Sequence, residues 1–485
     1  MNLTLDDFQA IWPALWLSGV ILVVVLWDAL VEDPLHKRWG GHVGAFALVG
    51  LIVASVYYPP EGKAFFGAYV ADDWSLFLQR AVWGLGAIAM LGGNDRARRV
   101  TPHRQGEGAF MTLVSLLGST LLFGAQDLLL LVVCFELMGI PLFVLAALEK
   151  QDKLGDQASQ PAEAAMKFFV IGVVSTPIAL LGAAFLIGLS GTTHIAEIAQ
   201  AKVEPATILG LVLMIAGMGF KIGVVPFHMW VPDTYQAAPT PFVAFLSTVP
   251  KIAGIAALSR IYLFGYAAAA NHWVPVVLAL CVATLVLGNL WALAQSNTKR
   301  LLAYSGIGHI GYILMGLLVV NNFGTQMLLF YLVGYGVTNL GAFLVLEAIE
   351  ADGGEGSISD LDGLWSRSPW LALSMLLFLL SLAGIPFVIG FWAKFYMFIA
   401  VWRGGYAWLV VLGALVAVVS LFYYLQMARA MYMTKPSAEQ RPLTVRVSLR
   451  FAIIACTLGV VGLGLYPNPL LELAGQAAAN FVASR

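Results

Sequence analysis

Long apolar stretches separated by short polar segments form the main pattern of this chain. An α-helix needs roughly 20 apolar residues to cross about 30 Å of hydrocarbon, because it rises about 1.5 Å per residue. Stretches of this length predict about fourteen membrane-spanning helices. They cover residues 8–30, 42–58, 74–93, 108–125, 127–148, 164–189, 206–230, 240–264, 273–295, 301–320, 325–348, 370–402, 406–432 and 451–469. The pattern therefore predicts an all-α polytopic membrane protein with short loops.

Two of the predicted helices, the seventh (206–230) and the twelfth (370–402), lie beside or contain residues that interrupt helices. These residues are Pro226, Pro232, Pro239 and Pro241 for helix 7, and Gly384, Pro386 and Gly390 for helix 12. Proline lacks an amide donor and clashes with the preceding turn, so we expect both helices to be broken.

Broken helices at corresponding positions of two halves are typical of inverted-repeat transporters. We therefore expect two inverted five-helix repeats, formed by helices 4–8 and 9–13, with Lys221 of helix 7 matching Lys394 of helix 12. The expected organisation is an N-terminal three-helix segment (1–107), a first antiporter-like repeat (108–264), a second repeat (265–432), and a C-terminal helix and tail (433–485).

Composition narrows the class of protein. Hydrophobic residues make up 60% of the chain and charged residues 11%, against about 45–50% and about 25% in soluble domains. Cys134, Cys281 and Cys456 lie far apart in apolar stretches, which argues against a disulfide framework, a zinc ribbon or an iron–sulfur cluster. The net charge of -1 offers no basic face for nucleic acid. We expect neither a metal nor a cofactor on this chain.

The distribution of lysine and arginine predicts the orientation in the membrane. Loops after odd-numbered helices hold Lys37, Arg38, Arg96, Arg98, Arg99, Arg104, Lys150, Lys153, Lys299, Arg300, Arg367, Lys435, Arg441, Arg446 and Arg450. Loops after even-numbered helices and the C-terminal tail hold Lys63, Lys202, Arg403 and Arg485. We therefore expect both termini on the outer side, which is the periplasm for a bacterial inner membrane.

Four ionisable residues, Glu136, Lys221, Lys251 and Lys394, lie near the middle of predicted helices. A charge at that depth is costly and usually marks an ion or proton path. The alternative is a set of structural ion pairs, such as Glu136 with Lys221, but buried pairs add little stability compared with apolar side chains. A lysine beside a mobile carboxylate takes up and releases a proton as its partner moves.

Other polar residues in the predicted helices allow simpler explanations. Arg80, Arg260 and Arg429 lie near helix ends, where a long side chain reaches the interface. Lys167 follows Glu163 by one turn, as in a solvated ion pair.

Two histidines extend the candidate path. A single histidine among apolar residues is more often a hydrogen-bonding partner than a relay, although its ordinary pKa suits proton transfer. His228 follows Lys221 near the helix break, whereas His309 lies inside helix 10. With Tyr304 and Ser305 nearby, His309 is expected to join Lys251 to Lys394 through water.

Several motifs resemble one family. They are FELMGIPLFVLAAL (135–148), EAAMKFF (163–169), FKIGVVPFHMWVPDTYQAAPTP (220–241), TVPKIAG (248–254), TKRLLAYSGIGHIGY (298–312) and LAGIPFVIGFWAKFYMF (382–398). The chain resembles the antiporter-like proton-pumping subunits of respiratory complex I, the NADH:quinone oxidoreductase, and most closely the subunit N branch.

This resemblance implies roles for residues at matching positions. Glu136 would pair with Lys221, Lys251 would bridge the halves through His309, and Lys394 would be the helix 12 lysine. Lys167 would be the family's helix 6 lysine. Flavin, iron–sulfur clusters and quinone would belong to other subunits, and neighbouring antiporter-like subunits would be partners.

The expected function is therefore proton translocation from cytoplasm to periplasm as a subunit of the oxidoreductase. Protons would pass Lys221, Lys251, His309 and Lys394, driven by quinone reduction elsewhere in the complex. Two alternatives stay open at this point, a subunit of a multi-subunit sodium/proton antiporter and a non-transporting membrane scaffold.

Overall fold

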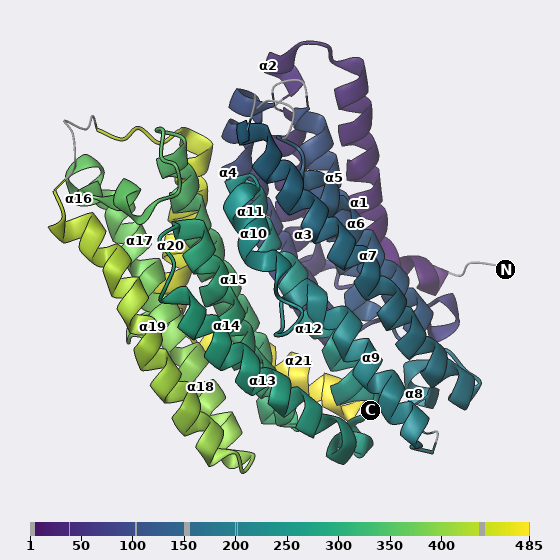
Figure 1. The fold of residues 1–485 in the computed structure, drawn as a ribbon. Helices are drawn as coiled ribbons and strands as arrows, with labels where there is room; N and C mark the ends of the chain where they lie inside the picture. Colours follow the sequence, from purple (N-terminus) through teal and green to yellow (C-terminus); the bar gives the residue numbers. More distant parts are fainter. Residues whose placement is uncertain are drawn as a thin grey trace.

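The computed structural model describes residues 5–37, 39–101, 104–149, 156–198, 200, 202–435 and 442–484. Five residues counted in the predicted charge asymmetry lie outside the described residues, namely Arg38, Lys150, Lys153, Arg441 and Arg485. In the described part, 13 helical stretches are long and apolar enough to cross a membrane. They form a bundle of roughly parallel helices (Figure 1), so the prediction of an all-α polytopic protein is confirmed.

Twelve of these stretches are single helices. They are α1 (Leu5–Leu30), α3 (Trp39–Tyr57), α4 (Asp73–Val100), α5 (Gln105–Gly124), α6 (Leu128–Ala146), α7 (Asp156–Ser190), α9 (Pro205–Ile222), α13 (Ala270–Ala292), α14 (Thr298–Leu318), α15 (Asn322–Glu350), α19 (Ala407–Met433) and α20 (Val447–Leu465). The thirteenth stretch, Thr240–Gly265, is divided. The remaining short elements are α2 (Pro34–Lys37), α8 (Ile195–Ile198), α16 (Leu364–Arg367), η1 (Phe65–Gly67), η4 (Ala267–Ala269), η5 (Ile358–Leu361), and the antiparallel strands β1 (Gly62–Ala64) and β2 (Tyr69–Ala71).

Helices 7 and 12 are broken, as predicted. Helix 7 consists of α9 and α10 (Trp230–Ala237), and helix 12 consists of α17 (Pro369–Ala383) and α18 (Ile389–Arg403). Gly223 and Gly384 end the first halves with φ of 78° and 85°, a conformation that glycine adopts without steric cost. Each glycine amide donates to carbonyls of the preceding helical turn.

Helix 8 is also interrupted, which the sequence did not predict. It consists of α11 (Thr240–Leu246), α12 (Val249–Ser259) and the π-helical turn η3 (Arg260–Gly265). The hydroxyls of Ser247 and Thr248 donate to the carbonyl of Ala244, and Pro250 supplies no amide to continue the helix. The break lies immediately before Lys251.

Ion pairs bring the ends of several helices together. The group named here the Arg96 cluster consists of Arg96, Arg99, Lys299, Glu149, Glu347 and Glu350. It joins the end of α4 to the end of α15, the start of α14 and the residues after α6. These ends all fall on the side that the loop charges assign to the cytoplasm.

Arg260 corrects one expectation. Its side chain is fully buried rather than at the interface, and it donates to the carboxylate of Asp72 at 2.7 Å and to the carbonyl of Phe123 at 2.8 Å. Arg80 also bonds within the protein, to Ser55. A guanidinium that is paired with a carboxylate and a carbonyl can lie buried inside the protein and does not have to reach the membrane–water interface.

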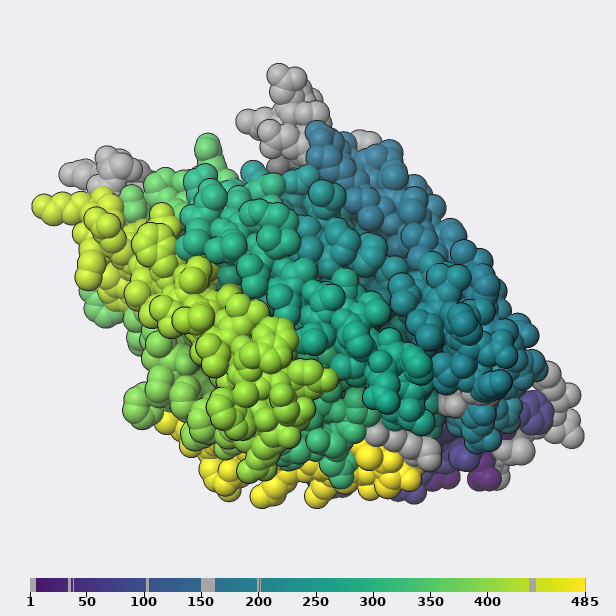
Figure 2. Space-filling view, turned by 60° about the horizontal axis from the view of Figure 1, so that its bottom comes forward, coloured from purple at the N-terminus to yellow at the C-terminus, as the bar shows by residue number. Residues whose placement is uncertain are grey.

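The segment after α20 is a second helix rather than a tail. The helix α21 (Asn468–Ala483) lies across one end of the bundle, close to the start of α15 and to α4 (Figure 1). Phe481 stacks on Trp74, and Gln326 donates to the carbonyl of Leu471. In Figure 2 these last residues run along the edge of a surface shared by both halves of the chain.

Candidate functional site

Glu136 and Lys221 form the first part of a buried polar line. Glu136 lies on α6, and Lys221 lies in the last turn of α9 before Gly223. The Lys221 Nζ is 3.9 Å from the Glu136 Oε1 and has no hydrogen-bond partner among the described residues. Thr176 of α7 donates to the same carboxylate oxygen at 2.9 Å. The lysine and the carboxylate are therefore close, but the lysine is not locked by a hydrogen bond.

The surroundings of the lysine are aromatic and tightly fitted. The Lys221 Nζ lies 5.2 Å from the ring centroid of Phe135 and 5.1 Å from that of Phe143. A Cβ at Gly139 would lie only 1.7 Å from this nitrogen. Glycine at that position therefore lets the ammonium approach the backbone of α6, while the aromatic faces attract the charge.

Lys167 lies apart from this pair. Its side chain is 46% exposed and forms ion pairs with Glu163 at 2.8 Å and Asp233 at 3.0 Å. Asp233 also accepts a hydrogen bond from Arg300. The structure therefore places Lys167 in a partly exposed charged group, which includes the intrahelical pair considered from the sequence.

Aromatic side chains fill the space between Lys167 and Lys221. Phe168 stacks on Trp230 with ring centroids 4.4 Å apart, and Trp230 lies 5.1 Å from Phe220. Phe168 and Phe220 are the sequence neighbours of the two lysines. These three rings therefore link α7, α9 and α10 beside the two lysines.

Lys251 lies at the centre of the bundle. It is 1% exposed and stands in the first turn of α12, directly after the break in helix 8. Its Nζ lies 3.4 Å from the hydroxyl of Tyr335 on α15 and 5.6 Å from the ring centroid of Tyr235 on α10. A Cβ at Gly306 of α14 would lie 3.1 Å from this nitrogen. Lys251 therefore faces α14 and α15 of the second half.

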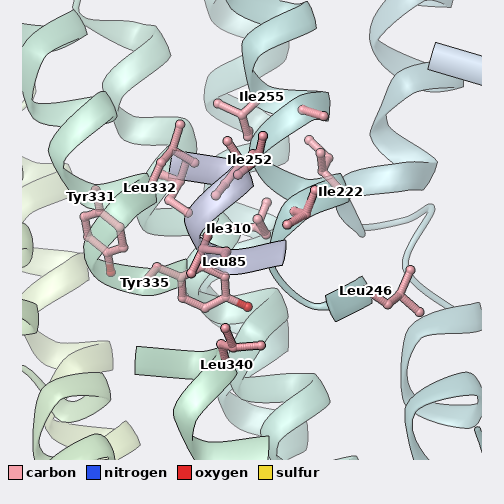
Figure 3. Close-up of a cluster of buried hydrophobic side chains, with 14 of the residues drawn as sticks. Leu85, Ile222, Leu246, Ile252, Ile255, Ile310, Tyr331, Leu332, Tyr335 and Leu340 are labelled. Carbon is pink, nitrogen blue, oxygen red and sulfur yellow. The ribbon is translucent and has the colours of Figure 1, made fainter. Parts of the chain in front are cut away.

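An apolar cluster lies next to both lysines. Ile222 follows Lys221, Ile252 follows Lys251, and both belong to the buried cluster drawn in Figure 3, together with Ile255. Apolar spaces of this kind exclude water. Lys221 Nζ has no hydrogen-bond partner among the described residues, so no hydrogen-bonded path leads from it to Lys251 in this conformation.

His309 lies in α14 between tyrosines of two other helices. Its Nδ1 is 2.9 Å from the hydroxyl of Tyr331, and its Nε2 is 3.3 Å from that of Tyr424. Ser305 bonds to the same hydroxyl of Tyr424, as expected for a residue near His309. Tyr304 does not take part, because its ring packs edge-on against Trp291.

A cavity of about 10 Å³ lies beside His309, roughly the volume that one water needs. Its lining residues include Tyr335 and Thr338 of α15 and Leu382 at the break in helix 12. The cavity therefore lies between His309 and the break in helix 12.

Lys394 ends the line. It lies on α18 and donates from its Nζ to the carbonyls of Leu382 at 2.8 Å and Ala383 at 3.1 Å, the last residues of α17. Carbonyls at a helix C-terminus carry partial negative charge and favour a cation. The Tyr312 ring centroid lies 4.8 Å away. The break in helix 12 thus supplies the partner that a carboxylate supplies to Lys221.

His228 lies outside this line. It is in the segment between α9 and α10, and its ring stacks on Trp291 with centroids 5.1 Å apart. Its Nδ1 has no hydrogen-bond partner within the described parts of the chain. The structure does not bring it to Lys221, Lys251 or Lys394.

The sequence that forms this polar line matches one protein family. Residues 125–420 match the family described as NADH:quinone oxidoreductase/Mrp antiporter, TM. The chain belongs to this family. The matched range contains Glu136, Lys221, Lys251, His309 and Lys394, and therefore the whole polar line.

Relatives within the family carry a consistent name. NADH-quinone oxidoreductase subunit N 2 of Roseiflexus castenholzii is 38% identical over 89% of both chains. Subunit N of Moorella thermoacetica is 37% identical over 92% of this chain and 93% of its own. Subunit N of Nitrosomonas europaea is 33% identical over 98% and 99%. The similarity to subunit N thus extends over nearly the whole chain.

Solved structures of the family share the fold. A chain of respiratory complex I from Thermus thermophilus with bound aureothin is 30% identical over 96% of this chain and 99% of its own, with a TM-score of 0.81. A chain of the Mrp complex from Dietzia sp. has a TM-score of 0.88 at 20% identity, covering 99% of this chain and 98% of its own. The second likeness concerns the fold alone.

Sequence reasoning missed the hydroxyl partners of the line. Tyr331 and Tyr335 bind His309 and Lys251, and Tyr424 binds His309 from α19. Tyr331 and Tyr335 are one helical turn apart, a spacing that places both on one face. Tyrosine in an apolar stretch is usually assigned to the core, so the four-residue spacing was not recognised as part of the site.

Proposed function

We propose that this chain is a proton-translocating subunit of the membrane arm of an NADH:quinone oxidoreductase. It moves protons from the cytoplasm to the periplasm, driven by quinone reduction elsewhere in the complex. The observation that carries the proposal is the buried line of Lys221, Lys251, His309 and Lys394, because ionisable groups at this depth are costly and mark ion paths. The names of the relatives agree with this role.

The Glu136–Lys221 pair is the control point of the first half. At 3.9 Å the carboxylate stabilises the charged lysine without a hydrogen bond that would hold it. Movement of Glu136 away from Lys221 removes this attraction, and the lysine then releases its proton toward the centre. Thr176 and Gly139 are positioning residues in this step, because they set where the two charges lie.

The second half takes the proton onward. Lys251 passes it to His309 through water beside Tyr335, since Tyr335 contacts Lys251 and His309 bonds to Tyr331 and Tyr424. Lys394 then releases it to the periplasmic side when the Leu382 and Ala383 carbonyls no longer hold the ammonium. For the two halves to act together, either water enters the apolar region beside Ile222 and Ile252, or a change of charge in one half acts on the other half without water between them.

The same proposal covers the enzyme, its partners and its location. The chain acts as a subunit of the oxidoreductase translocase and carries no redox centre itself, while flavin, iron–sulfur clusters and quinone belong to other subunits. Neighbouring antiporter-like subunits are its partners in a bacterial inner membrane, with both termini periplasmic. Lys167 and His228 lie apart from the buried line, and their part in proton translocation stays a prediction from the sequence.

The decisive experiment replaces Lys221 in the assembled complex. In inside-out membrane vesicles, Lys221→Met should lower the number of protons pumped per NADH oxidised. The matched control is Lys63→Met, which removes the same charge from an exposed strand outside the bundle. Full proton stoichiometry in Lys221→Met would refute the proposal and favour a scaffold.

A second function has structural support from the fold of the Mrp complex. A subunit of a sodium/proton antiporter would use the same buried lysines without quinone coupling. Purification of the native assembly distinguishes the two, because an oxidoreductase brings subunits with flavin and iron–sulfur absorbance. An assembly that lacks such subunits and exchanges sodium for protons would favour the antiporter.

A further inference from the structure

The helix α15 carries a row of residues that the proposed path uses only in part. Tyr331, Tyr335, Asn339, Phe343 and Glu347 occupy every fourth position, so each lies next to the one before it while the row winds around the helix. Tyr331 binds His309, and Tyr335 binds Lys251. The row continues beyond Lys251 to the Arg96 cluster at the predicted cytoplasmic end.

Asn339 is an unusual member of this row. Its side chain is fully buried, and neither amide atom has a hydrogen-bond partner among the described residues. The hydroxyls of Thr234 and Tyr235 on α10 are also buried and also have no hydrogen-bond partner among the described residues. Buried polar groups in native proteins are nearly always satisfied, and internal water supplies the partner where the protein does not.

These groups lie beside Lys251. The ring of Tyr235 is 5.6 Å from the Lys251 Nζ and meets Phe343 edge-on at 5.8 Å. Asn339 lies one turn from Tyr335 and one turn from Phe343, so Tyr235 contacts α15 one turn away from Asn339. Tyr335 projects from the helix into the same buried cluster as Leu340 (Figure 3).

The outer end of the row is charged. The Glu347 carboxylate is 1% exposed and binds Arg96 and Arg99 at 2.9 and 3.0 Å. Glu350 binds Lys299 at 3.0 Å and accepts from Thr240, the first residue of α11, at 2.6 Å. Glu350 thus joins the end of α15 to the start of the broken helix that carries Lys251.

We propose that Lys251 has its own proton supply from the cytoplasm, separate from the Glu136–Lys221 pair. The route runs from Glu347 and Glu350 past the Tyr235–Phe343 contact to Asn339, Tyr335 and Lys251. Internal water bound to Asn339 carries the proton. One hydronium gives its proton to the neutral Lys251 amine, which gains an N–H bond and leaves a water molecule. This inference rests on the proposed function.

The route explains two features of the site. No hydrogen bond among the described residues leads from Lys221 Nζ toward Lys251, so a separate supply lets the central lysine be reloaded without a direct transfer from Lys221. The edge-on contact of Tyr235 with Phe343 is an apolar barrier on the row. It limits back-flow when Lys251 is charged.

Thiol labelling tests the hydrated route without relying on activity. Asn339→Cys and Leu340→Cys are prepared in the assembled complex, since both side chains are fully buried but leave the helix on different faces. A small cationic methanethiosulfonate is applied to inside-out vesicles. Because a thiol reacts as the hydrated thiolate, we expect labelling of Asn339→Cys to be about tenfold faster. Equal rates, or no labelling at either position, would overturn the proposal.

Pumping measurements separate this proposal from the function on which it rests. Asn339→Leu keeps the branching and the number of heavy atoms of the side chain but cannot bind water, so it should lower protons pumped per NADH, while Asn339→Gln should restore them. Lys221→Met is measured in parallel. Full pumping in Asn339→Leu with a loss in Lys221→Met would refute the second route alone, whereas full pumping in both would refute the proposed function.

Discussion

Gly139 and Lys221 illustrate how single residues define the site. A charged pair at 3.9 Å is worth about 4 kcal/mol at an effective dielectric constant of about 20. The pairing of Glu136 with Lys221 was expected from the sequence, because two opposite charges in apolar stretches have few other partners. The need for glycine at position 139 was not, because it depends on where the end of a long side chain lies.

Gly139→Ala should reduce pumping by displacing the lysine. A shift of the ammonium by ~1 Å weakens the pair by about 1 kcal/mol, which changes proton occupancy about fivefold. The measurement is protons pumped per NADH in inside-out vesicles. Gly188→Ala is the control, since a Cβ there meets nothing within 4 Å. Equal pumping in the two variants would contradict the role given to Gly139.

At the scale of elements, the breaks in the helices position the cations. The two broken helices were predicted from proline and glycine, but the lysines lie on opposite sides of their breaks. Lys221 precedes Gly223 in α9, whereas Lys394 follows Gly384 in α18. The inverted repeat and the four-part organisation of the chain stay predictions. The third break, in helix 8, was missed because Ser247 and Thr248 do not interrupt an apolar pattern.

Gly384→Ala should reduce pumping mainly because it displaces the Lys394 side chain, and only in small part because it strains the backbone. A left-handed alanine costs about 1–2 kcal/mol, and its Cβ would also lie 2.8 Å from the Lys394 Cδ. Gly405→Ala adds the same backbone strain at φ 88°, but its Cβ meets nothing within 4 Å. We expect a loss of pumping in Gly384→Ala only. Equal losses in both variants would assign the effect to backbone strain.

At the scale of the whole molecule, ion pairs join segments far apart in sequence. The Arg260–Asp72 pair joins η3 to the residue that caps α4, while the Arg96 cluster joins α4, α14 and α15 at the other end. The sequence marked all of these residues as charged, and Arg260 was expected at the interface. Only the tertiary structure assigned their partners.

Asp72→Asn should destabilise the protein by leaving Arg260 buried without a counter-charge. Asparagine caps a helix as well as aspartate does, so the change isolates the ion pair, and the expected cost is about 3–5 kcal/mol. The measurement is the thermal denaturation of the detergent-solubilised complex. Asp33→Asn, which affects an exposed pair with His36, should cost less than about 1 kcal/mol. Similar melting of both variants would contradict this account.

The sequence by itself determined the membrane class, the broken seventh and twelfth helices and the buried charges, because each follows from local apolar length, backbone chemistry or the cost of burying charge. The tertiary structure decided which groups meet. It set Lys167 beside Asp233, gave Lys394 two carbonyls instead of a carboxylate, and brought Tyr335 to Lys251. Such contacts depend on how helices far apart in sequence pack, and hydroxyls in apolar stretches carry no sign of their partners.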